Sequence, residues 1–331
     1  MKAQITPFAE EHLPAAGRLL AQRHCANRAR FPLLPARFED PETAVKAVAA
    51  LWQKKFKSGY AAFRGGHLVA YLLGDAYVQP WARCGYVYLP GYALAAGESP
   101  ALIQDLYARL GENWVRRGIF SHGLYVSAAE PALVEALFDL GFGKERVDAL
   151  LDLRALDIPA VQLPAGVTIR QAVPGDNALI GGFSDRIFRA LAEAPYWHPT
   201  PPEEWDELLE GWSELPDDAE WALWMAMEGE APLAMNGFVA LEEADTDLLA
   251  APKTIELSIA ATHPGARGRG LGTALGWHGL RQAREAGYEL CYSNWISPNL
   301  LASRHWPRYG FQDVAYRLAK RVDPQITWTR G

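Results

Sequence analysis

The chain has 331 residues, of which 50% are hydrophobic and 21% are charged, so it is long enough for two domains and too apolar to be disordered. Its formal net charge of −7 disfavours a nucleic-acid-binding protein, because such proteins usually carry a basic face. Three widely spaced cysteines, and histidines without a metal-binding spacing, predict neither a disulfide framework nor a metal site.

The start of the chain, MKAQITPFAEEHLPAAG, does not resemble a secretion signal, because an acidic pair and a proline stand where the apolar core would lie. No apolar run approaches the ~20 residues of a membrane span, so we expect a cytoplasmic protein without a membrane partner. The first half is predicted to open with a strand at 5–8 and a helix within 12–23. A Gly-Phe pair then introduces a closing strand within 140–153.

The second half repeats this order about 165 residues later, with a strand at 167–172, a helix within 176–191 and a Gly-Phe pair before a strand within 309–321. Such an internal period is typical of a duplicated domain, although unrelated α+β domains share similar punctuation. Two prolines and a glycine favour a linker at 156–166. We therefore predict domains at 1–155 and 167–331.

The rest of the second half alternates between strand-like and helix-like segments. Strands are predicted at 235–244 and 254–262 with a turn between them, then a helix to about residue 286, a strand at 288–294 and a helix near 299–308. This alternation predicts an α+β fold in three layers, in which helices pack on a mixed sheet.

The segment HPGARGRGLG, residues 263–272, lies between the second of these strands and the helix that follows. It fits neither the dinucleotide fingerprint nor the Walker A loop. Its glycines nevertheless let backbone N–H groups approach a ligand at a helix N-terminus, where two arginines add positive charge. A pyrophosphate suits such a site. The alternative is a glycine-rich turn that lets the helix pack close to the sheet.

Two motifs in this half resemble the GNAT superfamily of N-acetyltransferases. The R-x-x-G-x-G pattern of residues 267–272 directly follows a strand, as the acyl-CoA loop does in that family. The N-x-x-A pattern of residues 299–302 precedes the Gly-Phe pair at 310–311 at the family's spacing. The resemblance covers residues 166–331 and, more faintly, the first half. It implies two GNAT-like domains, each a mixed, largely antiparallel sheet flanked by helices.

The resemblance implies acetyl-CoA as co-substrate and no metal. The pyrophosphate would lie on the loop and the helix start, at Arg267, Gly268, Arg269, Gly270, Leu271, Gly272 and Thr273. Ala260, Ala261 and Thr262 would pair with the pantetheine arm as with a further strand, since an open sheet edge leaves backbone groups free. Asn299 would lie near the end of that arm, or would cap a helix, and the two roles are compatible.

The resemblance also suggests a catalytic base. Glu256 lies on the strand before the loop, where several GNAT enzymes carry such a glutamate; the alternative is a surface residue of a half-exposed strand. Strict alternation would place its side chain with Ser258 and Ala260. The family's acid is a tyrosine seven residues after the asparagine, and here that position is Trp306, which cannot protonate a thiolate. Tyr309 lies on the same side of the helix, but a core position is the simpler interpretation.

The acceptor site is least defined. Residues 192–212 combine aromatic side chains with carboxylates, which suits a cationic amine. The candidates are Glu193, Trp197, His198 and Glu204. The alternative is an amphipathic helix over 202–212 with its tryptophans packed inward. A small-molecule or peptide amine is the expected acceptor, and the sequence does not indicate an oligomeric state.

The counterpart of the loop in the first half, residues 89–106, has no arginine and no Gly-x-Gly, and Glu98 would repel phosphates. We therefore expect only the second half to bind CoA. The predicted function is acyl-CoA-dependent N-acyltransfer, with acetyl as the expected group and direct transfer to an amine. The alternatives are a non-catalytic protein that binds or senses acyl-CoA and a protein that uses a different nucleotide on the same loop.

Overall fold

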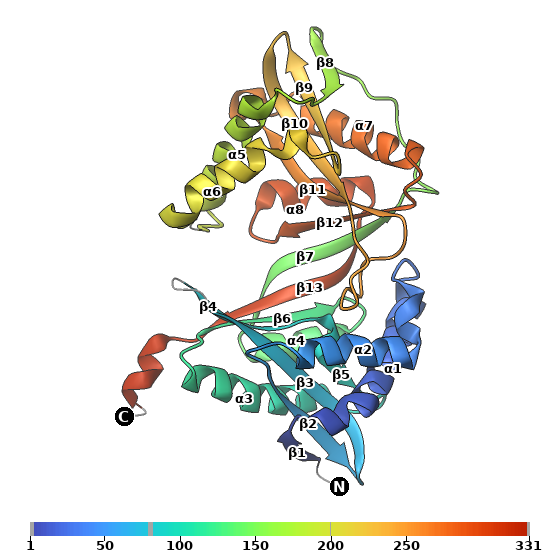
Figure 1. The fold of residues 1–331 in the computed structure, drawn as a ribbon, viewed down its shortest axis with the longest axis vertical. Coiled ribbons are helices and arrows are strands. Elements are labelled where there is room, and N and C mark those ends of the chain that lie inside the picture. The colour runs from blue at the N-terminus through green and yellow to red at the C-terminus, as the bar shows by residue number, and fades with distance from the viewer. Residues whose placement is uncertain (1–2, 79–81, 199, 330–331) are drawn as a thin grey trace. The chain divides into compact units, whose positions relative to one another are not determined.

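The computed structural model describes residues 3–78, 82–198 and 200–329 (Figure 1). The chain divides into two compact units. The first unit comprises residues up to Asp148, the segment Glu243–Pro252 and the residues from Asp313 onward. The second comprises Ala149–Glu242 and Lys253–Gln312. In the described ranges, no helix is both long and apolar enough to cross a membrane.

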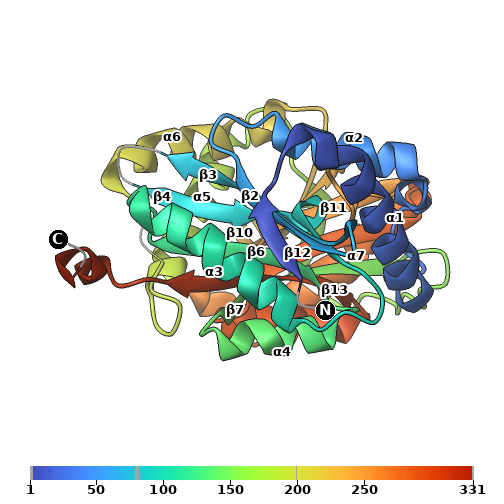
Figure 2. The same ribbon diagram turned by 90° about the horizontal axis from the view of Figure 1, so that it is seen from below.

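The first unit is a sheet with strand order β1-β2-β3-β4-β6-β13-β7, and β5 pairs with β3. Its strands are β1 (Gln4–Pro7), β2 (Ser58–Arg64), β3 (His67–Val78), β4 (Arg83–Val87), β5 (Tyr92–Leu94), β6 (Ser121–Ser127), β7 (Gly143–Asp152) and β13 (Gln312–Arg321). Its helices are α1 (Leu13–Arg30), α2 (Pro41–Trp52), α3 (Ala101–Arg116) and α4 (Pro131–Asp139). Helices α1 and α2 pack together where Gly17 meets Val45 (Figure 2).

The last strand of the chain belongs to the first unit. Strand β13 pairs antiparallel with β6, from Ala315 opposite Ser127 to Arg321 opposite Ser121. The loop between β10 and β11 also lies in this unit. Arg37 donates to the carbonyl oxygen of Ala244 at 3.0 Å and pairs with Glu243. The core of the first unit is therefore built from both halves of the sequence.

The second unit has strand order β12-β11-β10-β9-β8, and residues 149–152 at the end of β7 also belong to it. Its strands are β8 (Val167–Gln171), β9 (Trp221–Glu228), β10 (Ala231–Ala240), β11 (Thr254–Thr262) and β12 (Leu290–Ile296). Its helices are α5 (Asn177–Ala192), α6 (Pro202–Ser213), α7 (Leu271–Glu285) and α8 (Leu300–His305). Strand β11 is parallel to β12, whereas the pairs β8–β9, β9–β10 and β10–β11 are antiparallel.

Helices cover both faces of this second sheet (Figure 1). On one face, Ile180 and Phe183 of α5 pack on Met225, Met235 and Ile259 of three neighbouring strands. Each such fully buried side chain stabilises the fold by about 2 kcal/mol. On the other face, Leu271 and Leu275 of α7 pack on Ala226 and Ala234. The predicted mixed, largely antiparallel sheet between helical layers is confirmed.

The predicted elements of the second half are present, but two of them have other bounds. The strand predicted at 235–244 is β10, which spans Ala231–Ala240, and the last helix is shorter than predicted. Helix α8 ends at His305 rather than near residue 308, and a 3-10 turn over Trp306–Tyr309 follows it. Pro307 explains this early end, because it has no backbone N–H to continue the helical hydrogen bonds.

Candidate functional site

The glycine loop joins the end of β11 to the start of α7, through a 3-10 turn at Pro264–Ala266. Gly268 has a φ of 79° and Gly270 a φ of 78°, a left-handed conformation that residues with a Cβ rarely adopt. A Cβ built on either glycine would meet no atom within 4 Å. These positions therefore require glycine for backbone conformation, and the space in front of them is open.

The N-terminus of α7 has no capping side chain, because its N-cap residue is Gly270. The N–H of Ala274 donates to the carbonyl oxygen of Gly270 at 2.9 Å and is the first to make a hydrogen bond within the helix. The N–H groups of Leu271, Gly272 and Thr273 precede it and have no helical acceptor. Together with the helix dipole, these N–H groups favour an anion in front of the helix. The adjoining residues Arg267–Gly270 are exposed to solvent.

One of the two loop arginines has a protein partner. Arg269 Nη2 donates to Glu228 Oε1 at 2.7 Å, and both side chains are partly exposed. Glu228 is the last residue of β9, 41 positions away in sequence, so the sequence alone gave no signal for this pair. The carboxylate of Glu228 offsets part of the positive charge that the two arginines give the loop.

Strands β11 and β12 separate beside the loop. Their parallel pairing covers Thr254–Leu257 and Leu290–Ser293. On its other edge β11 pairs with β10 as far as Thr262. In the described structure, the β12-facing edge of residues 258–262 therefore has no strand partner, and its backbone groups can bind an extended ligand arm. Ala260, Ala261 and Thr262 lie on this free edge, where the sequence placed the pantetheine contact.

A β-bulge at Ser258 corrects the predicted orientation of Glu256. Ile259 pairs with Gly237, but Leu257 pairs with the very next residue, Phe238, so β11 has one extra residue here. Glu256 therefore faces the same side as Ile259, beneath α5 and α6, and not the side of Ala260. Strict alternation fails because a bulge reverses the facing of every residue beyond it.

Glu256 has a partner that sequence reasoning missed. Asn294 Nδ2 donates to Glu256 Oε1 at 3.3 Å from the neighbouring strand β12, and both side chains are partly buried. Asn294 lies two residues beyond Tyr292, which is level with Glu256 in the parallel register. Only that register brings the two side chains together, so the sequence could not have indicated the pair.

The last helix places Asn299, Trp306 and Tyr309. Asn299 caps α8, since its Oδ1 accepts from the N–H of Ala302 at 3.3 Å, which confirms the capping role. Its contact with the pantetheine arm remains a prediction. Trp306 and Tyr309 are both buried, as the core interpretation of Tyr309 predicted.

The four acceptor candidates lie around the segment between α5 and α6. Glu193 follows α5, and its carbonyl oxygen accepts from the N–H of Trp197 at 2.9 Å. Trp197 is 69% exposed and has a φ of 49°, while the His198 ring stacks on Tyr196. Glu204 lies in the first turn of α6. Within the described ranges, no side-chain hydrogen bond or ion pair joins these four residues, so their role in binding an acceptor remains a prediction.

Helix α6 matches the amphipathic alternative. Trp205 and Trp212 both pack edge-on against Phe188 of α5, with ring centroids 6.0 and 5.7 Å apart. Two of the aromatic residues in this segment therefore pack against the protein itself, and no ligand is needed to explain them. Trp197 is thus the aromatic candidate whose surface is free for an acceptor.

In the first unit, the counterpart of the loop is filled by the protein. Its residues Leu89, Pro90, Gly91 and Tyr92 are buried. The carboxylate of Glu98 is bound by Arg64 at 2.8 Å. That this half does not bind CoA remains a prediction.

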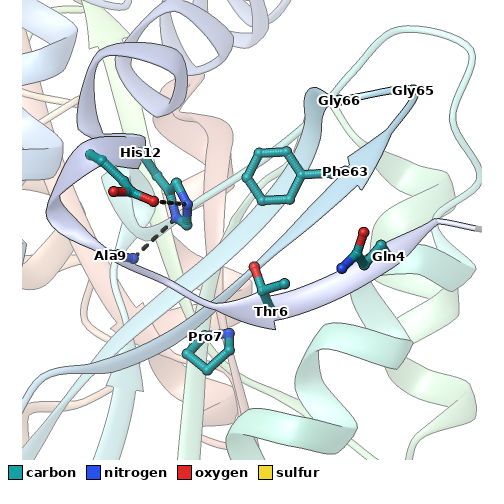
Figure 3. A pocket seen from close by; sticks show the side chains of 9 residues that line it. Gln4, Thr6, Pro7, Ala9, His12, Phe63, Gly65 and Gly66 are labelled. Carbon is teal, nitrogen blue, oxygen red and sulfur yellow. Dashed lines mark hydrogen bonds and ion pairs between the residues drawn. The ribbon is translucent and has the colours of Figure 1, made fainter.

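A separate open depression of about 470 Å³ lies in the first unit, and its lining residues come from β1, the turn after it and the β2–β3 hairpin (Figure 3). His12 Nδ1 accepts from the N–H of Ala9 at 3.0 Å beside Phe63. The lining residues are Gln4, Thr6, Pro7, Ala9, Glu11, His12, Phe63, Gly65 and Gly66. None of the predicted site residues is among them.

Residues 185–311 match the family model described as "Acetyltransferase (GNAT) family". This family match lies in the C-terminal half of the chain. This match spans the loop, Glu256 and Asn299, and it supports an N-acetyltransferase in general terms. A mycothiol acetyltransferase from Saccharomonospora viridis is 27% identical over 223 residues, which are 66% of this chain and 67% of that protein.

Two solved structures share the fold over nearly the whole chain. A GCN5-related N-acetyltransferase from Sphaerobacter thermophilus has a TM-score of 0.58 at 18% identity and covers 96% of this chain and 95% of its own. A tandem GNAT protein from the clavulanic acid biosynthesis pathway has a TM-score of 0.51 at 15% identity, and the match covers 97% of this chain and 98% of that chain. The predicted pair of GNAT-like domains is therefore confirmed as a fold.

Proposed function

We propose that this protein transfers an acyl group, normally acetyl, from CoA to an amine, and that the active site lies in the second unit. The observation that carries this proposal is the separation of β11 from β12 next to the uncapped, glycine-bounded start of α7. The free strand edge suits an extended amide-containing arm, and the helix start suits a pyrophosphate. Acetyl-CoA contains both groups in one molecule.

The residues present fit this ligand. The open space before Gly268 and Gly270 admits the pyrophosphate, with the backbone from Arg267 to Thr273 as donors. Ala260, Ala261 and Thr262 would pair with the pantetheine arm on the free edge of β11. Asn299 would lie near the end of that arm while it caps α8.

Glu256 is the proposed base. An alkylammonium acceptor with a pKa near ~10.4 must lose a proton before it attacks the thioester, which costs roughly 4 to 5 kcal/mol at neutral pH. The Glu256 carboxylate would take this proton directly or through water, and the Asn294 amide holds it in place. The bulge at Ser258 interrupts the regular pairing of β11 with β10. We expect a backbone N–H of β11 at this bulge to donate to the thioester oxygen as negative charge develops on it.

The CoA thiolate leaves without a tyrosine acid in the expected position. Trp306 is buried and its indole N–H cannot protonate sulfur. A thiol pKa near ~8.5 makes solvent protonation sufficient. Trp306 also favours the second candidate function, a protein that binds or senses acyl-CoA without turnover. The acceptor would enter from the α5–α6 side, where Glu193, Trp197, His198 and Glu204 are the candidates.

Calorimetric titration with acetyl-CoA, NAD and ATP, each in a separate experiment, tests the proposal. We expect one acetyl-CoA per chain and no binding of NAD or ATP. Two acetyl-CoA per chain would overturn the inactive first half, and no binding would overturn the function. A screen of amines for release of free CoA thiol then separates an enzyme from a sensor, because a sensor binds acetyl-CoA but releases no thiol with any amine.

A further inference from the structure

Tyr309 contacts the first turn of α7 through its hydroxyl group. The Tyr309 hydroxyl lies 3.2 Å from the carbonyl oxygen of Thr273 and 3.3 Å from that of Gly272. Tyr309 is only 3% exposed and ends the 3-10 turn that follows α8. A side chain near the end of the chain therefore touches the helix start that is proposed to bind the pyrophosphate.

The direction of these hydrogen bonds follows from the groups involved. A carbonyl oxygen can only accept, so the single hydroxyl proton of Tyr309 is shared between Gly272 and Thr273. His305 Nε2 lies 3.1 Å from the same hydroxyl, and the tautomer with a hydrogen on Nε2 donates to the hydroxyl oxygen. Burial lowers the pKa of His305, and both the neutral Nε2–H form and the cation can donate from this nitrogen.

Close packing fixes the position of the Tyr309 ring. A Cβ at Gly276 would lie 2.2 Å from the Tyr309 hydroxyl, so only glycine admits the side chain at this turn of α7. The ring also packs edge-on against Trp277 at 4.6 Å and beside Trp306 at 5.8 Å. The hydroxyl is therefore held against the helix by its surroundings and not only by its own hydrogen bonds.

The two carbonyls belong to the first peptide groups of α7. The N–H of Thr273 has no acceptor within the helix, whereas the N–H of Ala274 donates to the carbonyl oxygen of Gly270 at 2.9 Å. The carbonyl of Gly272 shares its peptide with the N–H of Thr273, and the carbonyl of Thr273 shares its peptide with the N–H of Ala274. A hydrogen bond accepted by a carbonyl polarises the whole peptide group and strengthens its N–H as a donor. A donor at the carbonyl end thus acts on anion binding at the other end.

We propose that Tyr309 is a positioning residue that holds and polarises the first turn of α7, so that this turn binds the pyrophosphate of acyl-CoA more tightly. This inference rests on the proposed function, since it assigns a role at the same site. In this role Tyr309 does not act as the acid that protonates the CoA thiolate. Its hydroxyl donates to backbone carbonyls, and burial raises the pKa of that hydroxyl.

The test compares Tyr309→Phe with the wild type by calorimetry on two probes. Acetyl-CoA carries the pyrophosphate, whereas S-acetylpantetheine carries the arm without it. We expect the variant to bind acetyl-CoA about three- to tenfold more weakly, the range for one neutral hydrogen bond, and S-acetylpantetheine unchanged. The amide proton signals of Thr273 and Ala274 should also move upfield in its ¹H–¹⁵N spectrum, since less polarised N–H groups are better shielded.

Tyr107→Phe is the matched control. Tyr107 is also a buried tyrosine whose hydroxyl meets a histidine, His122 Nδ1 at 2.7 Å, but it lies on α3 in the first unit. This control should leave both affinities unchanged. Unchanged acetyl-CoA affinity in Tyr309→Phe, or an equal loss for both probes, would overturn the positioning role alone. Failure of the wild type to bind acetyl-CoA would overturn it together with the proposed function.

Discussion

Arg269 Nη2 in the glycine loop and Glu228 Oε1 at the end of β9 form an ion pair, with 2.7 Å between the two atoms. The proposed pyrophosphate site therefore carries a carboxylate beside one of its two arginines. A bound phosphate must share Arg269 with Glu228 or draw it away, and in both cases the negative charge of Glu228 opposes the ligand. The charge balance of the site is less positive than the loop sequence suggests.

Glu228→Gln should therefore strengthen the binding of acetyl-CoA. Both side chains are partly exposed, so the expected gain is modest, about two- to fivefold in Kd, and larger at low ionic strength. Calorimetry at two salt concentrations measures it. Glu112→Gln is the matched control, because Glu112 pairs with Arg116 at 2.7 Å on α3 of the first unit. Weaker binding in Glu228→Gln would mean that Glu228 positions Arg269 for the ligand.

Gly270→Asp tests the loop as a pyrophosphate site. The new side chain would place a carboxylate in the open space before α7 and would strain the left-handed backbone. We expect acetyl-CoA binding to fall by about 100-fold or more, because a like charge inside an anion site costs several kcal/mol. Calorimetry gives the affinity and thermal unfolding gives the fold.

Gly66→Asp controls for the backbone strain. Gly66 has a φ of 79° and equally open surroundings, but it lies in the β2–β3 turn of the first unit. The two variants should lose similar stability, and only Gly270→Asp should lose acetyl-CoA. Retained binding in Gly270→Asp would show that the ligand lies elsewhere.

Glu256→Gln tests the base once an amine substrate is known. The amide keeps the size of the side chain and cannot accept a proton from the acceptor, so kcat should fall by about 10²- to 10⁴-fold. The Kd of acetyl-CoA should stay unchanged, because Glu256 faces the α5–α6 side of β11. Glu230→Gln, in the β9–β10 turn, is an exposed control in the same unit. An unchanged kcat in Glu256→Gln would remove this residue from the mechanism.

The sequence predicted what depends on local pattern. Most strands and helices of the second half and the cap at Asn299 follow from neighbouring residues, whereas β9 was not predicted. It could not predict what depends on strand register. The bulge at Ser258 reversed the expected facing of Glu256, and the parallel register with β12 supplied Asn294.

The sequence also did not indicate that two segments of the second half belong to the first unit. Duplicated domains predict that each half closes its own sheet, but β13 pairs with β6 in the first unit. The loop that joins β10 to β11 also lies there, held by Arg37. Both arrangements use segments that look like ordinary closing strands and turns, so no local pattern distinguishes them.

The buried His24 gives the first unit a pH-dependent stability. Burial lowers the pKa of His24 from 6.5 to about 4, and its Nε2 lies 2.7 Å from the carbonyl oxygen of Pro35. The unfolded chain therefore binds a proton at this residue at a higher pH than the folded chain does. As pH falls from about 6.5 towards 4, this one site should reduce the free energy of unfolding by about 3 kcal/mol, and above pH 6.5 it should have no effect.

His24→Gln removes the titrating group while it keeps a hydrogen-bond donor for Pro35. The variant should lose some stability at pH 7, because the amide packs less well beside Phe38, which meets the imidazole edge-on at 5.6 Å. Its urea midpoint should then fall less steeply than that of the wild type between pH 6.5 and 4. His67→Gln, at an exposed histidine of β3, should leave the pH profile unchanged. Parallel profiles for the wild type and His24→Gln would mean that His24 has the same pKa in the folded and the unfolded chain, and would contradict the prediction.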